Sequence, residues 1–431
     1  MGILLSPGWD GGDLSAARTR LLAVGLAIGA VALITACGLQ AAREWLGQEN
    51  PEAAVTLGLA DAEAMSAMAE ILGADAGRPG HDAEATRYAQ EALRAAPLDV
   101  RALRVLGLEA DKAGGATRAR MLMVIADRWS RRDSPAQLWL FGQAMMAGDW
   151  PNASLHADAL LRRRWRLETV LFPAMASALR DPAAVAPFAE RLDEVPDWRR
   201  SFLGALAWKA PDPGVAARLF LALAAGPIPP NDEDDANLIG RYVSQGDYAG
   251  ARALWMRLLP RGSAGAADLV YNGDFHLAPG AAPFNWRLIQ SDGVTTETVP
   301  ATDGAPALHV LAPAAKNTAA AEELVSLPPG TYRLTGMALV EPGLAGDLFS
   351  WRVSCVAQPD TPIAEAHQSS GSMGWRLFLV DFQVGQGCVA QWLRLEGLAH
   401  SGFQPAEAWY RGLKLQALAA SSSAVPKPRA E

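Results

Sequence analysis

A chain of 431 residues is too long for one ordinary core, so two or three domains are expected. Because 50% of the residues are hydrophobic and only 19% are charged, we expect the chain to fold and exclude a largely disordered protein. The net charge of −8, and the lack of a basic run interleaved with aromatic residues, argue against a nucleic-acid partner.

The first predicted element is a transmembrane helix over residues 21–42. The stretch from Leu21 to Leu39 carries no charge, and a helix of that length just spans a hydrocarbon core about 30 Å thick. Arg18 and Arg20 precede it, which favours a cytoplasmic location for residues 1–20. Abundant alanine, and arginine in excess of lysine, are typical of a GC-rich bacterial genome. We therefore expect a single-pass protein of the bacterial inner membrane, with the bulk of the chain in the periplasm.

A second interpretation of this segment stays open. The sequence LITAC, from Leu33 to Cys37, resembles a bacterial lipobox, in which the cysteine is lipidated after the leader is cleaved. Cys37 would then carry the lipid, and the protein would be a lipoprotein. Both interpretations export the remaining chain and hold it at a membrane.

Between residues 50 and 262 the sequence repeats itself. Turn motifs such as AGGATRA, AGDWPNA and QGDYAGA separate stretches with apolar residues at every third or fourth position. Equivalent positions in five such turns lie 31 to 34 residues apart, a period that predicts a solenoid of paired α-helices. These positions are Gly114, Gly148, Asp181, Asp212 and Gly246.

Helix starts in this array carry capping signals. Ser134, Asp181 and Asp212 each stand before a proline, whose missing N–H costs nothing in the first turn of a helix. Asp99 precedes another apolar-periodic stretch. We expect these four side chains to cap their helices, because each has an oxygen that accepts an N–H of the first turn.

The segment from Ala83 to Arg164 resembles tetratricopeptide repeats (TPRs). One repeat carries the large, small and glycine positions of that motif at Leu103, Leu106, Gly107, Ala110, Gly114, Ala119, Met123 and Ala126. The next carries them at Leu138, Phe141, Gly142, Met145 and Ala153. Between Trp165 and Pro230 the period survives but the motif does not, so we expect helix pairs there without the strict pattern. The resemblance implies a concave groove that binds a partner protein.

From residue 268 to residue 418 the apolar period changes from 3.6 to 2. The stretches at 327–340, 348–357, 375–384 and 408–418 alternate as strands do, and they predict an antiparallel β-sandwich. The tail over residues 419–431 is polar and contains proline, so we expect it to be disordered. The predicted fold class is thus multidomain: a transmembrane helix, an all-α repeat array and an all-β jelly roll.

The start of this region resembles jelly-roll modules that bind carbohydrates. Those modules often begin with a strand of sequence Asn-Gly-Asp/Gly-Phe-Glu, and Asn272, Gly273, Asp274 and Phe275 match it. His276 replaces the usual glutamate, which removes an acidic ligand of the structural calcium site found in that family. The resemblance implies a jelly-roll fold and a glycan as a second partner, and we expect no metal or cofactor.

Three residues are candidates for contact with such a ligand. Trp375 follows the loop SSGSMG, which favours exposure, and Trp286 and Asp274 lie near the start of the sandwich. Cys355 and Cys388 are expected to form a disulfide, because the domain is predicted to face an oxidising compartment. The three cysteines form no CxxC or Cys/His cluster, which argues against a zinc site.

The sequence contains no HExxH, GxSxG or P-loop motif, and no catalytic constellation was found. We therefore expect a non-enzymatic scaffold or assembly protein that binds a protein through its repeats. Proteins that combine TPRs with a jelly roll are similar to those that accompany bacterial exopolysaccharide export. Two alternatives stay open: a lipoprotein that assembles an envelope complex without binding glycan, and a glycan-acting enzyme with an unrecognised site.

Overall fold

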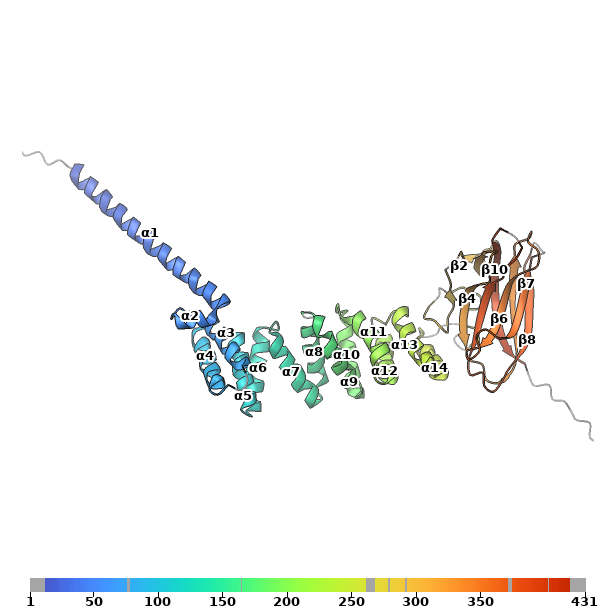
Figure 1. The fold of residues 1–431 in the computed structure, drawn as a ribbon, viewed down its shortest axis with the longest axis horizontal. Helices are drawn as coiled ribbons and strands as arrows, with labels where there is room; N and C mark the ends of the chain where they lie inside the picture. Colours follow the sequence, from blue (N-terminus) through green and yellow to red (C-terminus); the bar gives the residue numbers. More distant parts are fainter. Residues whose placement is uncertain are drawn as a thin grey trace, which may run out of the picture. The chain divides into compact units, whose positions relative to one another are not determined.

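The computed structural model describes residues 12–75, 78–163, 165–260, 268–277, 280–290, 293–370, 374–401 and 403–418 (Figure 1). Of residues 12–21, 23 and 165 it describes the backbone alone. The predicted disordered tail lies outside the described residues, as does most of the predicted cytoplasmic segment. The chain divides into two compact units, residues 1–165 and 166–431.

The first unit begins with a long apolar helix, α1 (Gly12–Glu49), which continues beyond the predicted end at residue 42 (Figure 1). Its stretch Val24–Glu49 contains an apolar window of 18 residues with a mean hydropathy of 1.9, and that window is 0% buried. By length and composition this helix can cross a membrane, a property that an N-terminal signal sequence shares. The last turns of α1 pack on the array, because Gly47 brings its backbone against Ala64.

Seven further helices follow in the described part of the first unit, and each contacts the next in sequence. Gly107 explains the close packing inside one pair, since a Cβ at this position would lie 3.1 Å from the Met123 side chain. The helices are α2 (Pro51–Thr56), α3 (Ala62–Ala74), α4 (His81–Ala95), α5 (Val100–Lys112), α6 (Ala116–Trp129), α7 (Ser134–Ala147) and α8 (Trp150–Leu161).

The second unit continues with helices and ends in the sandwich. Helix α9 packs on α11, α10 on α12, α11 on α13 and α12 on α14, the stacking of a solenoid, although the TPR motif fails over this stretch. The predicted run of paired helices is confirmed. The helices are α9 (Glu168–Ala178), α10 (Pro182–Asp193), α11 (Arg199–Lys209), α12 (Pro213–Ala224), α13 (Asp232–Ser244) and α14 (Tyr248–Leu258), after the 3-10 turn η1 (Trp165–Leu167).

The turn signals of the sequence lie where the helices of a pair meet. Gly114, Gly148 and Gly246 adopt left-handed backbone conformations, with φ of 78°, 67° and 79°. The carboxylates of Asp181 and Asp212 cap α10 and α12, accepting N–H bonds of 2.9 and 2.8 Å.

Two further caps were predicted, and one of them was wrong. Asp99 caps α5 as expected, with its carboxylate 2.9 Å from the nitrogen of Ala102. Ser134 does not cap α7, because the capping residue is Asp133, which accepts the N–H of Ala136 at 2.9 Å. Pro135 then occupies the second helical position, where its missing N–H is still harmless.

The C-terminal region is an antiparallel sandwich of two five-stranded sheets (Figure 1), which confirms the predicted fold class. One sheet has the order β1-β4-β9-β6-β7 and the other β2-β3-β10-β5-β8. The strands are β1 (Arg287–Leu288), β2 (Thr295–Pro300), β3 (Pro306–Ala312), β4 (Thr318–Val325), β5 (Gly330–Val340), β6 (Asp347–Cys355), β7 (Pro362–Ser369), β8 (Arg376–Val384), β9 (Gln391–Gly397) and β10 (Ala406–Ala417).

The motif at Asn272 to Phe275 is a turn and not the first strand that its resemblance implies. Asn272 and Phe275 both have a positive φ, 53° and 55°, which a strand cannot accommodate. The Asn272 side chain bonds both backbone groups of Leu277 and so stabilises the turn. A Cβ on Gly273 would lie 2.1 Å from the carbonyl oxygen of Leu413, so only glycine permits this close approach to β10.

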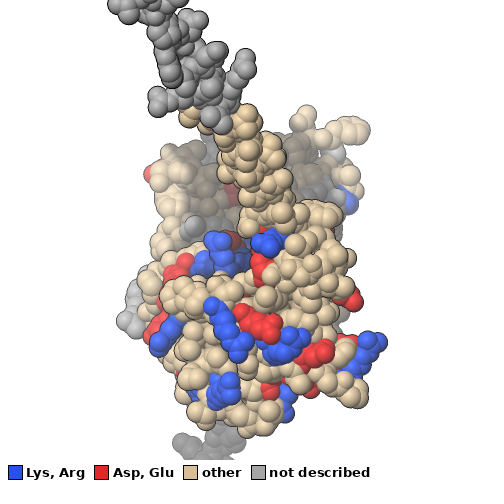
Figure 2. Space-filling view, turned by 90° about the vertical axis from the view of Figure 1, so that its left-hand side faces the viewer, with Lys and Arg blue, Asp and Glu red and all other residues tan. Residues whose placement is uncertain are grey.

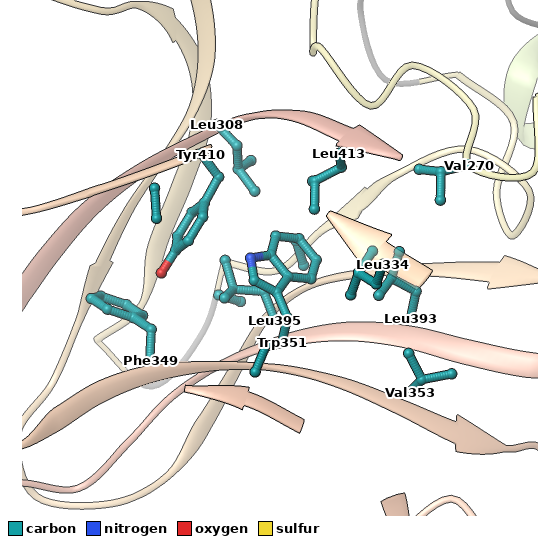
Figure 3. Packing of buried hydrophobic residues seen from close by; sticks show 14 of the residues in the cluster. Val270, Leu308, Leu334, Phe349, Trp351, Val353, Leu393, Leu395, Tyr410 and Leu413 are labelled. Carbon is teal, nitrogen blue, oxygen red and sulfur yellow. The ribbon is translucent and has the colours of Figure 1, made fainter. Parts of the chain in front are cut away.

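Aromatic rings fill the space between the two sheets (Figure 3). Trp286 contacts Trp351 edge to face, with centroids 5.6 Å apart, and Trp351 contacts Tyr410 in the same manner. Phe349 also contacts Tyr410 edge to face, with centroids 6.1 Å apart. All four side chains are at most 1% exposed, so the alternation of the strands has placed the largest rings in the core.

The last helix shares a core with the start of the sandwich. Trp255 of α14 packs edge to face on Tyr271, at 4.9 Å, and contacts Phe284 at 5.9 Å. Arg252 lies over the ring of Trp255. Glu323 of β4 is fully buried below this cluster and accepts the N–H of Tyr271 at 2.9 Å. Burial raises the pKa of Glu323 well above its usual range.

Candidate functional site

An apolar groove of about 450 Å³ lies between α9 and α11. Its floor contains Phe172 and Phe202, whose rings meet edge to face at 5.2 Å, and Leu206. Small side chains such as Ala176 and Ala205 line the remainder and leave the floor accessible. The volume falls in the range of about 300–1,000 Å³ that is usual for ligand pockets. This groove can therefore take one or more large apolar side chains.

Polar groups lie at the edges of the groove. Glu168 begins α9, and Lys209 ends α11 and is exposed. Neither side chain has an ion pair with any described residue. The exposed Thr169 and Ser201 also line the groove. A ligand here would meet an apolar floor between a carboxylate and an ammonium group.

A second candidate surface is the outer face of the sheet β2-β3-β10-β5-β8. Strand register places Glu297, His309, Trp409 and Leu339 in one row across it, and Trp375 continues the row just before β8. Two strand spacings, about 10 Å, separate the backbones of the two tryptophans. Both tryptophans are partly exposed residues of this face.

Charged groups hold the aromatic rings of this face in place. His309 stacks on Trp409 with centroids 4.8 Å apart, and its ring nitrogens lie 3.2 and 2.8 Å from Glu297 and Glu407. The Arg411 guanidinium lies 4.0 Å above the Trp375 ring. Aromatic faces beside polar groups are the combination that binds a sugar ring, by packing on its C–H face and bonding its hydroxyls.

Arg411 has a second charged contact on the same face. Its guanidinium is 2.6 Å from the Asp303 carboxylate, and this hydrogen bond holds the pKa of Asp303 below its usual value. Leu377 and Leu379 of β8 extend the surface as exposed apolar side chains, 65% and 53% exposed. The face therefore combines apolar, aromatic and charged groups.

The structure separates the three ligand candidates of the sequence. Trp286 is 1% exposed, and its indole N–H donates to the carbonyl of Asn272 at 3.2 Å, so it belongs to the core and offers no ligand surface. Trp375 lies on the outer face described above. Asp274 is exposed and is 2.6 Å from His276, and both line a shallow hollow of about 610 Å³ beside Lys414. Neither tryptophan lines that hollow.

Cys355 and Cys388 are joined by a disulfide in the structure, with their Cα atoms 5.4 Å apart. The bond links the end of β6 to the turn before β9. Cys37 is a free and exposed residue of α1. Among the residues that the structure describes, no group of three or more His, Cys, Asp or Glu side chains is placed to hold a metal ion.

Two candidate features lie outside the residues that the sequence indicated. The groove lies in the stretch where the TPR motif fails, so the motif gave no position for it. Trp409 was one of several tryptophans available in the sandwich, and its type did not distinguish a core residue from a surface residue. The alternation of side chains along a strand could have distinguished them. Tyr410 is fully buried, so its neighbours Trp409 and Arg411 must point to the opposite, outer face of the sheet.

Charge is mixed on the face of the molecule that Figure 2 shows. Lys and Arg side chains are interspersed there with Asp and Glu side chains, and neither sign gathers into one large patch.

The architecture defines the class of this protein: an N-terminal apolar helix, a run of paired helices and a two-sheet antiparallel sandwich.

Solved structures include similar folds at low sequence identity. TmCBM61, solved in complex with beta-1,4-galactotriose, is 14% identical, with a TM-score of 0.26 over 35% of this chain and 99% of its own. The CBM22-1 xylan-binding domain from Paenibacillus barcinonensis Xyn10C is 12% identical, with a TM-score of 0.27 over 35% and 94%. The Pseudomonas aeruginosa pilF protein is 16% identical, with a TM-score of 0.26 over 48% and 96%. No protein-family model and no curated protein matches the chain.

Proposed function

We propose that this protein is a non-enzymatic, membrane-anchored scaffold of the bacterial periplasm that binds a partner protein through its helical array. The observation that carries the proposal is the apolar groove between α9 and α11, whose aromatic floor is open to a ligand. Stacked helix pairs provide such extended surfaces for other proteins. The apolar helix α1 would hold the array at the inner membrane.

A site-specific photocrosslinking experiment in cells tests the protein-binding role. A photoreactive residue at Ser201, on the edge of the groove, is expected to form adducts with another protein. The matched control is Glu190 of α10, which is exposed and does not line the groove. Adducts from both positions alike, or from neither, would count against binding through this groove.

A second function, glycan binding by the sandwich, is favoured by the row that contains Trp409 and Trp375. Such binding would suit a role in polysaccharide biosynthesis or export. The test is a glycan array with the full chain. Trp409→Ala is expected to abolish binding, whereas Trp392→Ala should preserve it, because Trp392 lies on the other sheet. If the folded protein binds no glycan, glycan binding by the sandwich is rejected and the scaffold function alone remains.

The mode of anchoring has its own measurement. A signal anchor keeps Met1 to Leu39 in the mature protein, whereas a lipoprotein begins at a lipidated Cys37. The intact mass of the purified protein distinguishes them. We propose the signal anchor, and a mass that matches a chain starting at acylated Cys37 would establish the alternative of an envelope lipoprotein.

A further inference from the structure

The groove between α9 and α11 contains a feature that a helix surface normally lacks. Pro173 lies inside α9 and lines the groove together with Thr169, four residues earlier. In an α-helix the carbonyl of Thr169 would accept the N–H of residue 173, and proline has none. The Thr169 carbonyl is thus left without its helical donor on an exposed residue of the groove.

This carbonyl favours a partner segment with an extended backbone. A helical partner has used its N–H groups within its own helix, apart from those of its first turn. An extended segment still carries N–H groups that need acceptors, so it can donate to Thr169. The floor formed by Phe172, Phe202 and Leu206 would receive a side chain from the same segment.

Two charged residues of the groove, Lys209 and Glu168, determine which groups the partner can carry next to its apolar side chain. Lys209 is exposed at one end of the groove and has no ion pair among the described residues, so it can bind a carboxylate of the partner. Glu168 lies on the first turn of α9, toward the other end, and would repel a second acidic group. A segment with an acid on the Lys209 side therefore complements the groove in only one direction.

We propose that the groove recognises an extended segment of a partner protein that carries a bulky aliphatic or aromatic residue close to an acidic residue. The apolar side chain enters the floor, a backbone N–H donates to the carbonyl of Thr169, and the acid pairs with Lys209. The inference rests on the proposed scaffold function and names the chemistry of its partner.

A phage-displayed random heptapeptide library, selected on the full chain in nanodiscs, provides the probe. Enriched peptides are expected to combine Leu, Met, Phe or Trp with a nearby Asp or Glu. Ala205→Trp fills the groove and should weaken the best peptide by about tenfold or more. No enrichment on folded protein, or equal binding by Ala205→Trp, would overturn the proposal.

A charge reversal tests the acidic preference. Lys209→Glu should weaken the acidic peptide by about tenfold and favour a version in which lysine replaces the acid. The matched control is Arg200→Glu on the same helix. Arg200 is exposed, does not line the groove and pairs with Glu233 at 2.9 Å, so this reversal should leave peptide affinity unchanged. An acidic preference that survives in Lys209→Glu would contradict the pairing.

Pro173→Ala tests the carbonyl separately from helix stability. Alanine restores an N–H that occupies the Thr169 carbonyl, so the helix should become more stable while the peptide binds severalfold more weakly. Because Pro173 also lines the groove, a peptide whose donor amide is N-methylated provides the comparison, and it should bind equally to Pro173→Ala and to the unaltered protein. Unchanged affinity would remove Thr169 from the recognition.

Crosslinking from Ser201 separates this inference from the proposed function. Adducts that persist in Lys209→Glu but are lost in Ala205→Trp, without peptide enrichment, would keep the scaffold and reject the extended acidic segment. Absence of adducts from Ser201 in the unaltered groove would reject both.

Discussion

Trp351 of β6 and Tyr410 of β10 meet edge to face across the two sheets, with ring centroids 5.5 Å apart and planes at 89° (Figure 3). Among the described residues, neither the indole N–H nor the phenol hydroxyl has a hydrogen-bond partner. Burial raises the pKa of Tyr410 well above its usual value. The pair therefore contributes packing but leaves two buried polar atoms unsatisfied.

Tyr410→Phe is expected to stabilise the sandwich by about 1 kcal/mol, because the ring packing remains and an unpartnered buried hydroxyl is removed. Hydrogen exchange of β10 and its neighbours β3 and β5 measures this. Tyr332→Phe is the matched control: its hydroxyl donates to the carbonyl of Pro328 at 2.8 Å, so the change should cost about 1 kcal/mol. If Tyr410→Phe is destabilising, the hydroxyl has a partner.

Removal of the disulfide between Cys355 and Cys388, by changing both to serine, should lower the stability of the sandwich by about 3–4 kcal/mol. The bond closes a loop with a sequence separation of 33, which restricts the unfolded chain. Urea unfolding of the full chain, with and without reductant, gives the difference, and Cys37→Ser is the control. Labelling of all three thiols in unreduced protein would contradict the bond.

Gly273→Ala should prevent the turn at residues 272–275 from packing on β10, since the new Cβ would lie 2.1 Å from the carbonyl oxygen of Leu413. We expect a loss of protection from hydrogen exchange in the sandwich. Gly142→Ala in α7 provides the contrast: nothing lies within 4 Å of its Cβ, and alanine should stabilise the helix by about 0.5–1 kcal/mol. Equal tolerance of both changes would show that the close approach is not required.

Asp235 of α13 makes the array sensitive to pH. Burial, and then the charges of Asp232 and Asp234, raise its pKa from 3.8 to about 7. Below pH 4 both folded and unfolded chains hold the proton. Between pH 4 and 7 only the folded chain keeps it, so stability is lost as the pH rises.

Asp235→Asn should therefore be more stable than the unaltered protein at pH 8, by on the order of 3 kcal/mol, and equal to it at pH 3.5. Hydrogen exchange of α13, corrected for the intrinsic rate at each pH, provides the measurement. A stability that rises with pH over this range in the unaltered protein would show that Asp235 ionises freely in the fold.

Local chemistry was sufficient to predict the array. The period of its turns, and capping by residues such as Asp99 and Asp212, depend on neighbours in sequence. Asp133 and Ser134 are both good capping residues. With Asp133 as the cap, Pro135 is the second residue of the helix, and with Ser134 as the cap it would be the first.

Long-range contacts explain what the sequence did not reveal. The turn at Gly273 exists because of Leu413, which is distant in sequence, so its motif was mistaken for a strand. Trp286, just before β1, is buried in the core, whereas Trp409 of β10 is partly exposed, and this difference depends on packing with residues distant in sequence. The groove between α9 and α11 arises from small residues on two helices that no motif connects.

The shared core of Trp255, Tyr271 and Phe284 limits how this protein can be divided. A fragment that begins at residue 268 would retain Tyr271 and Phe284 but lose the indole that covers them, and Glu323 would lose the neighbouring charge of Arg252. The sandwich is therefore not a domain that can be moved to another protein without α14. A shuffled or truncated gene would need to carry α14 with it to encode a soluble β-domain.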